Sequence, residues 1–96
     1  MLIYEITATV DAELIPDYEK YMTERHIPDL LATGQFTTAS IAKAGNLYRI
    51  RYHAATREHL DAYLTNDAPR LRADFAEHLP GGVEVSREIF EMVGTF

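Results

Sequence analysis

Four histidines are the side chains of this sequence with the clearest capacity for chemistry, because imidazole titrates closest to neutral pH. They stand at positions 26, 53, 59 and 78. No two of them share the H-x-H or H-E-x-x-H spacing that places two imidazoles on one metal ion. The sequence also lacks cysteine, which removes thiolate ligands, thiolate nucleophiles and disulfides. We therefore expect neither a metal site nor a cofactor.

His26 has the most unusual setting of the four histidines. It lies just before Pro28, which cannot donate a helical backbone hydrogen bond and suits the first turn of a new helix. The pattern predicts a break here, with His26 at the bend, and a helix end at Gly34 in the left-handed conformation. Two roles follow for His26. It either clamps a helix end, where a cation is favoured, or acts as a general base toward a ligand.

A second group of candidate residues lies on the predicted strand 47–54. Its odd positions include Arg49, Arg51 and His53, whereas Tyr48 belongs to the apolar even side. These four residues are candidate ligand-binding residues, since hydroxyl, guanidinium and imidazole groups supply hydrogen bonds without a metal. The alternative for the odd positions is a solvated sheet face with interleaved charges.

Other catalytic classes lack their motifs. Ser40 and Ser86 lie inside predicted strands without the glycines of a nucleophile elbow, which disfavours a hydrolase triad. The glycine pair 81–82 is a turn, and no glycine-rich phosphate loop or dinucleotide fingerprint is present.

The composition describes one soluble domain over residues 1–96. Hydrophobic residues make up 47% and charged residues 25% of the chain. The net charge of −6 opposes binding to nucleic acid or to an anionic membrane surface, because both require basic protein surfaces. No apolar segment is long enough for a membrane span, and Glu5 interrupts any signal peptide. We expect a cytoplasmic protein.

The elements that position these residues follow from periodicity. Alternating apolar residues predict strands, apolar residues three and four apart predict helices, and Asp11 and Thr56 are candidate helix caps. A tight hairpin is expected at Gly45-Asn46. The predicted order is strand 2–10, helix 14–26, helical turn 28–33, strand 36–43, strand 47–54, helix 56–79 interrupted at Pro69, and strand 83–93. This β-α-β-β-α-β order predicts an α+β, ferredoxin-like fold with a four-stranded antiparallel sheet and helices on one face.

Two helices cover only one face of such a sheet, so the other face is either solvated or covered by another subunit. Strands 2–10 and 47–54 are central neighbours in this fold, and Glu5 is expected to pair with an arginine of the second strand. Ile3 and Leu47 lie on the same uncovered face, which a solvated sheet seldom requires. We therefore predict a homodimer formed through the open sheet face.

The motif H-I-P-D-x-x-A-T-G-x-F at residues 26–36, together with residues 68–72 and the two central strands, resembles a family of short bacterial proteins known as a domain of unknown function. The resemblance covers nearly the whole chain. It implies membership of the dimeric α/β-barrel superfamily, which includes cofactor-independent monooxygenases, small isomerases and decarboxylases, haem-degrading enzymes and ligand-sensing domains. It implies no catalytic residues, because one fold hosts many functions.

Two functional hypotheses remain. In the first, a homodimer binds a small organic molecule between helices and sheet and transforms it by metal-free proton transfer, with His26 as base and Tyr48 or Arg49 orienting the ligand. In the second, the chain is a non-catalytic assembly or interaction module whose polar sheet face is a subunit interface.

Overall fold

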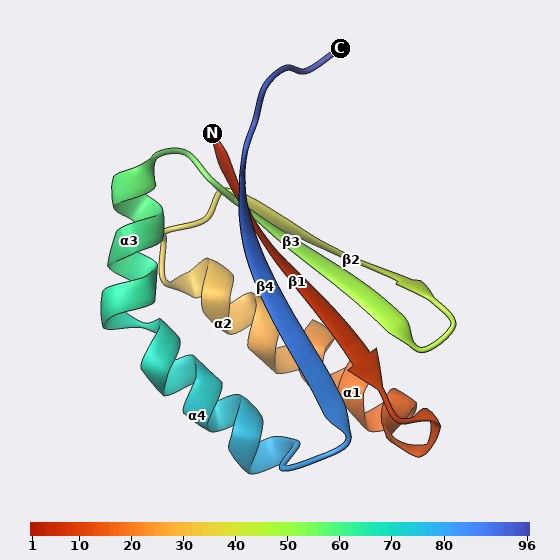
Figure 1. The fold of residues 1–96 in the computed structure, drawn as a ribbon. Coiled ribbons are helices and arrows are strands. Elements are labelled where there is room, and N and C mark those ends of the chain that lie inside the picture. The colour runs from red at the N-terminus through yellow and green to blue at the C-terminus, as the bar shows by residue number, and fades with distance from the viewer.

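A computed structural model describes all residues 1–96 as one sheet packed against a layer of helices (Figure 1). The four strands lie in the order β2-β3-β1-β4, and each neighbouring pair is antiparallel. The predicted ferredoxin-like order is confirmed. The elements are β1 (Leu2–Val10), a 3-10 turn η1 (Ala12–Leu14), α1 (Ile15–Tyr21), a π-helical turn η2 (Met22–His26), α2 (Ile27–Ala32), β2 (Thr38–Ala44), β3 (Leu47–Ala54), α3 (Arg57–Asn66), α4 (Ala68–His78) and β4 (Val83–Glu91).

The two faces of the sheet differ in the way the alternation predicts. Even-numbered residues of β1 and β3 face the helices, and Tyr4, Ala8, Ile50 and Tyr52 are almost completely buried there. Odd-numbered residues occupy the open face. No helix is both long and apolar enough to cross a bilayer.

Glu5 and Arg51 form the predicted cross-strand pair on the open face. They are register partners in the β1–β3 ladder, and Arg51 Nε donates a hydrogen bond of 2.6 Å to Glu5 Oε1. Because the arginine side chain remains half exposed, this pair fixes register more than it adds stability.

The predicted break at Pro28 is wrong, because the chain stays helical from Ile15 to Ala32. Helicity continues through a wider turn, in which the Ile27 N–H bonds to the Met22 carbonyl five residues back. A proline ring normally clashes with the carbonyl four residues earlier. The wider turn gives Pro28 room against the preceding turn, so the helix passes the proline without ending. His26 therefore lies within the helix rather than at its end.

Other boundaries follow local chemistry. Gly34 ends the helix with φ of 80°, and Thr56 accepts a hydrogen bond from the His59 N–H at 3.3 Å, both as predicted. Asp11 precedes the 3-10 turn without a side-chain capping bond, so its predicted capping role is wrong. The last strand ends at Glu91, and the final residues extend away from the sheet (Figure 1).

Gly34 provides a test of the helix end. Replacing it by alanine is expected to lower the free energy of unfolding by about 1 kcal/mol, because an L-residue is strained at this positive φ. Space is not the cause, since a Cβ at Gly34 would meet no atom within 4 Å. Gly81 is a matched control, being equally open but without positive φ. Urea denaturation of both variants should show the loss only for Gly34→Ala, and equal losses would contradict this explanation.

Candidate functional site

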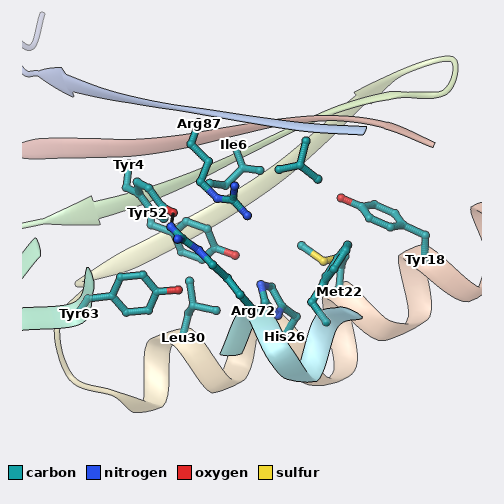
Figure 2. Close-up of a pocket in the computed structure, with 12 residues that line it drawn as sticks. Tyr4, Ile6, Tyr18, Met22, His26, Leu30, Tyr52, Tyr63, Arg72 and Arg87 are labelled. Carbon is teal, nitrogen blue, oxygen red and sulfur yellow. Dashed lines mark hydrogen bonds between the residues drawn. The ribbon is translucent and has the colours of Figure 1, made fainter. Parts of the chain in front are cut away.

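An apolar cavity lies between the sheet and the helices (Figure 2), and a second, more open hollow lies beside Glu19 and Tyr48. The volume of the apolar cavity is about 70 Å³, which is room for several water molecules. Nine of its twelve lining residues are hydrophobic. A concave, mostly apolar site with a few polar groups is the usual form of a small-molecule site.

His26 lines this cavity from the π-helical turn. Its imidazole stacks edge-on against Phe75, with ring centroids 5.6 Å apart. Burial lowers the pKa of His26 to about 4, and Arg87 acts in the same direction, whereas Asp29 and Asp74 oppose the shift. The imidazole is therefore neutral at pH 7. Wider π-helical turns are frequent at functional sites, and this one supplies the cavity with its only histidine.

A polar network holds the back of the imidazole. Arg25 binds Asp74 through two hydrogen bonds of 2.9 and 2.7 Å, and Tyr21 Oη donates a third to the same carboxylate at 2.7 Å. Donation by Arg25, and then by Tyr21, holds the pKa of Asp74 well below its usual range. The network joins α4 to the helix that carries His26.

The same network indicates which imidazole nitrogen carries the proton. Tyr21 Oη lies 3.5 Å from His26 Nδ1 and has only one proton, which it donates to Asp74. It can therefore only accept a hydrogen bond from Nδ1–H. This assignment leaves the lone pair on Nε2, where it is free to accept a proton.

Tyr52 lines the cavity, and its hydroxyl is an unpaired polar atom that is buried from water. Its side chain is only 1% exposed, and its Oη has no hydrogen-bond partner in the protein. Burial raises the pKa of the hydroxyl, which stays protonated. Because unpaired buried polar atoms are costly, this hydroxyl is a position where a bound molecule would gain a hydrogen bond.

Two arginines line the cavity from opposite sides, Arg72 from α4 and Arg87 from β4 (Figure 2). Arg72 donates a hydrogen bond of 3.0 Å to Tyr4 Oη. Neither arginine forms an ion pair, although the other seven cations of the chain include five that do.

The structure does not gather all the candidate residues of the sequence around His26. Tyr48 faces the helices at a different point, where its hydroxyl donates to Glu19. Arg49, Arg51 and His53 lie on the open face, on the opposite side of the sheet from the cavity. His26 alone among the five lines the cavity.

Sequence reasoning did not assign three residues to the cavity. Tyr52 reads as an ordinary apolar-face residue. Arg70 and Arg72 flank the buried Leu71, which predicts the solvent side for both, with binding of an anionic ligand as the alternative. Arg87 lies opposite Ile6 in the ladder and so faces the helices, but the pattern of β4 is ambiguous in sequence. The register between β4 and β1 could have revealed Arg87, because it pairs Arg87 with Ile6 and so places Arg87 on the face that the helices cover. Nowhere do three acidic or histidine side chains gather to hold a metal ion.

The geometry defines a small ferredoxin-like domain with an apolar cavity beneath its helices. The chain belongs to the family described as "Domain of unknown function (DUF4286)", whose model matches residues 1–93. Among curated proteins, none matches the sequence closely enough to count as a relative.

Solved structures share this fold at low sequence identity. The haem degrader MhuD from Mycobacterium tuberculosis, solved with two haems in its active site, is 18% identical with a TM-score of 0.73, covering 100% of this chain and 99% of that one. An antibiotic biosynthesis monooxygenase is 13% identical with a TM-score of 0.67, covering 98% and 100%. A de novo designed protein with a ferredoxin fold is 18% identical with a TM-score of 0.55, covering 99% and 88%. At these identities the likeness establishes the fold alone.

The lowered pKa of His26 predicts a specific pH dependence. The unfolded chain binds a proton on this histidine near pH 6.5, whereas the folded chain does so only near pH 4. Between these values the unfolded state holds the extra proton, so the free energy of unfolding should fall as the pH is lowered from 6.5 to 4.

Urea denaturation across this range, with His26→Gln as the comparison, isolates the contribution of the imidazole. The variant should lose less stability on acidification than the wild type. An NMR titration in which His26 protonates near 6.5 would contradict its burial in the neutral form.

Proposed function

We propose that the cavity binds a small organic molecule and that His26 moves a proton on it without a metal. The observation that carries this proposal is the neutral imidazole in an apolar cavity that also contains an unpaired hydroxyl. A neutral imidazole has a lone pair with which to accept a proton, and its low pKa requires that the bound molecule raise that pKa for efficient transfer.

The proposed chemistry assigns one role to each side chain. His26 Nε2 takes a proton from a carbon next to a carbonyl group of the bound molecule. The electron pair of the broken C–H bond forms a C=C bond, and the π pair of the carbonyl moves to its oxygen. Tyr52 Oη donates a hydrogen bond to this oxygen as its charge develops. Asp74, acting through Tyr21, stabilises the imidazolium, and return of the proton to the oxygen or the carbon completes an isomerisation or exchange.

Haem does not fit this cavity in its present form. A four-pyrrole macrocycle is several times larger than the space of about 70 Å³, and Phe75 and Arg72 border that space. The proposed chemistry therefore does not involve haem.

Butanone is a suitable neutral probe for a space of this size, because its CH₂ group lies between a methyl group and a carbonyl. It should perturb the NMR signals of Met22, His26 and Tyr52, which line the cavity. In D₂O the wild type should incorporate deuterium into this CH₂ group about 100-fold faster than His26→Gln, as the loss of a general base implies.

Lys20→Gln serves as a control for this experiment, since it changes an exposed cation outside the cavity and should leave exchange unchanged. Binding confined to the outer surface, or equal exchange rates in wild type and His26→Gln, would contradict the proposal.

We further propose that the chain functions in the cytoplasm as a homodimer formed through the open sheet face. Ile3 and Phe90 are register partners on this face, and Phe90 is 44% exposed. The charges of the face are divided, because Arg49 and Arg51 lie on β3 while three glutamates lie on β1 and β4, at positions 5, 84 and 88. Two copies related by a twofold axis could place opposite charges together.

This face also supports a second candidate function, a non-catalytic assembly module. In that case Arg49, Arg51 and His53 would serve subunit contacts, and the cavity would be incidental. The separation of positive and negative charges on the open face favours the assembly module. The unpaired Tyr52 hydroxyl favours the ligand-binding function.

Light scattering tests the dimer directly. The wild type should have the mass of two chains at micromolar concentration, and Phe90→Glu should shift it toward one chain. Leu31→Glu is the matched control, because Leu31 is also partly exposed but lies on α2, away from the open face. A wild-type monomer, or equal effects of both substitutions, would contradict this interface.

A further inference from the structure

We propose that the molecule bound in the cavity is a small organic carboxylate, whose anionic group is held by Arg72 and Arg87. This inference rests on the proposed function of the cavity and specifies the chemical class of its ligand.

The distribution of ion pairs points to an anion. The chain carries nine lysines and arginines, fifteen acidic residues and a net charge of −6, so carboxylate partners are abundant. Five of the nine cations form an ion pair with a carboxylate, namely Arg25, Lys43, Arg51, Arg57 and Arg70. Two of the four cations without a partner nevertheless line one cavity. Both arginines are exposed residues, so water can solvate them, but their convergence on one cavity makes that cavity the best candidate anion site of the chain.

The cavity contains nothing that neutralises these arginines. None of its twelve lining residues is acidic. The one hydrogen bond recorded for Arg72 goes to the neutral hydroxyl of Tyr4, which orients the guanidinium without satisfying its charge. Arginine is well suited to this task, because its planar N–H groups match the two oxygens of a carboxylate.

The rest of the cavity selects the body of the ligand. Met22, Leu30 and the rings of Tyr4 and Tyr63 form apolar walls, which suit a hydrocarbon or aromatic group. Tyr52 Oη, buried and without a partner, requires a carbonyl or hydroxyl oxygen on the ligand. Figure 2 shows the arginines, Tyr52 and His26 directed toward the same space. A carboxylate that also carries a carbonyl or hydroxyl oxygen and an apolar group would match the arginines, the Tyr52 hydroxyl and the apolar walls.

2-Oxobutanoate and butanone form a matched pair for the test, because the first carries a carboxylate where the second carries a methyl group. Calorimetry on the full chain should show 2-oxobutanoate binding at least tenfold more tightly. Arg87→Gln should remove most of this difference by weakening 2-oxobutanoate alone. Arg72→Lys should weaken it less than Arg72→Gln, since charge is kept while the fork geometry is lost. Lys20→Gln, which removes an unpaired cation elsewhere, should change neither affinity.

The outcomes separate this inference from the function on which it rests. If butanone binds in the cavity and 2-oxobutanoate binds no more tightly, the carboxylate assignment is wrong while the ligand-binding function stands. If neither compound perturbs the cavity signals at millimolar concentration, both are wrong. If Lys20→Gln weakens 2-oxobutanoate binding as much as Arg87→Gln does, the loss of net charge explains the effect and the assigned arginine site is wrong.

Discussion

The structure depends on the use of tyrosine to fill the space between sheet and helices. All six tyrosines of the chain belong to its core of eighteen buried residues. A buried tyrosine ring stabilises the fold as a large apolar group, but its hydroxyl also requires a hydrogen-bond partner. That requirement is met at the border of the core, where Tyr21, Tyr48 and Tyr4 are bonded to Asp74, Glu19 and Arg72.

The same requirement connects the fold to the candidate site. Tyr21 orders Asp74 and Arg25 behind His26, and Tyr4 orders Arg72 beside the cavity. Tyr18, Tyr52 and Tyr63 have no hydrogen-bond partner within the protein, and of these three hydroxyls only that of Tyr52 is fully buried. The groups bonded to Tyr21 and Tyr4 are thus groups that shape the site, and the buried, unpaired Tyr52 hydroxyl marks where a ligand would complete the network.

Periodicity and turn chemistry were sufficient to predict the strands, the order of elements, Gly34 and the Glu5–Arg51 pair. Each of these depends on local spacing or on register between neighbouring strands. The π-helical turn was not predictable, because Pro28 indicates a break unless the preceding turn widens, and tertiary packing rather than local sequence decides that. The site was mostly unpredictable for the same reason. Tyr52, Arg72 and Arg87 come from β3, α4 and β4, and only the folded chain brings them to one cavity.

The central claim is that a neutral His26 presents a free Nε2 to a ligand cavity, with its Nδ1–H directed at Tyr21. Long-range ¹H–¹⁵N correlation spectra of the imidazole at pH 7 measure this directly, because protonated and lone-pair nitrogens have different shifts. The account predicts a neutral ring with the proton on Nδ1 and an Nε2 signal that moves when butanone is added. A protonated ring, or a neutral ring with its proton on Nε2 and no response to the probe, would contradict it.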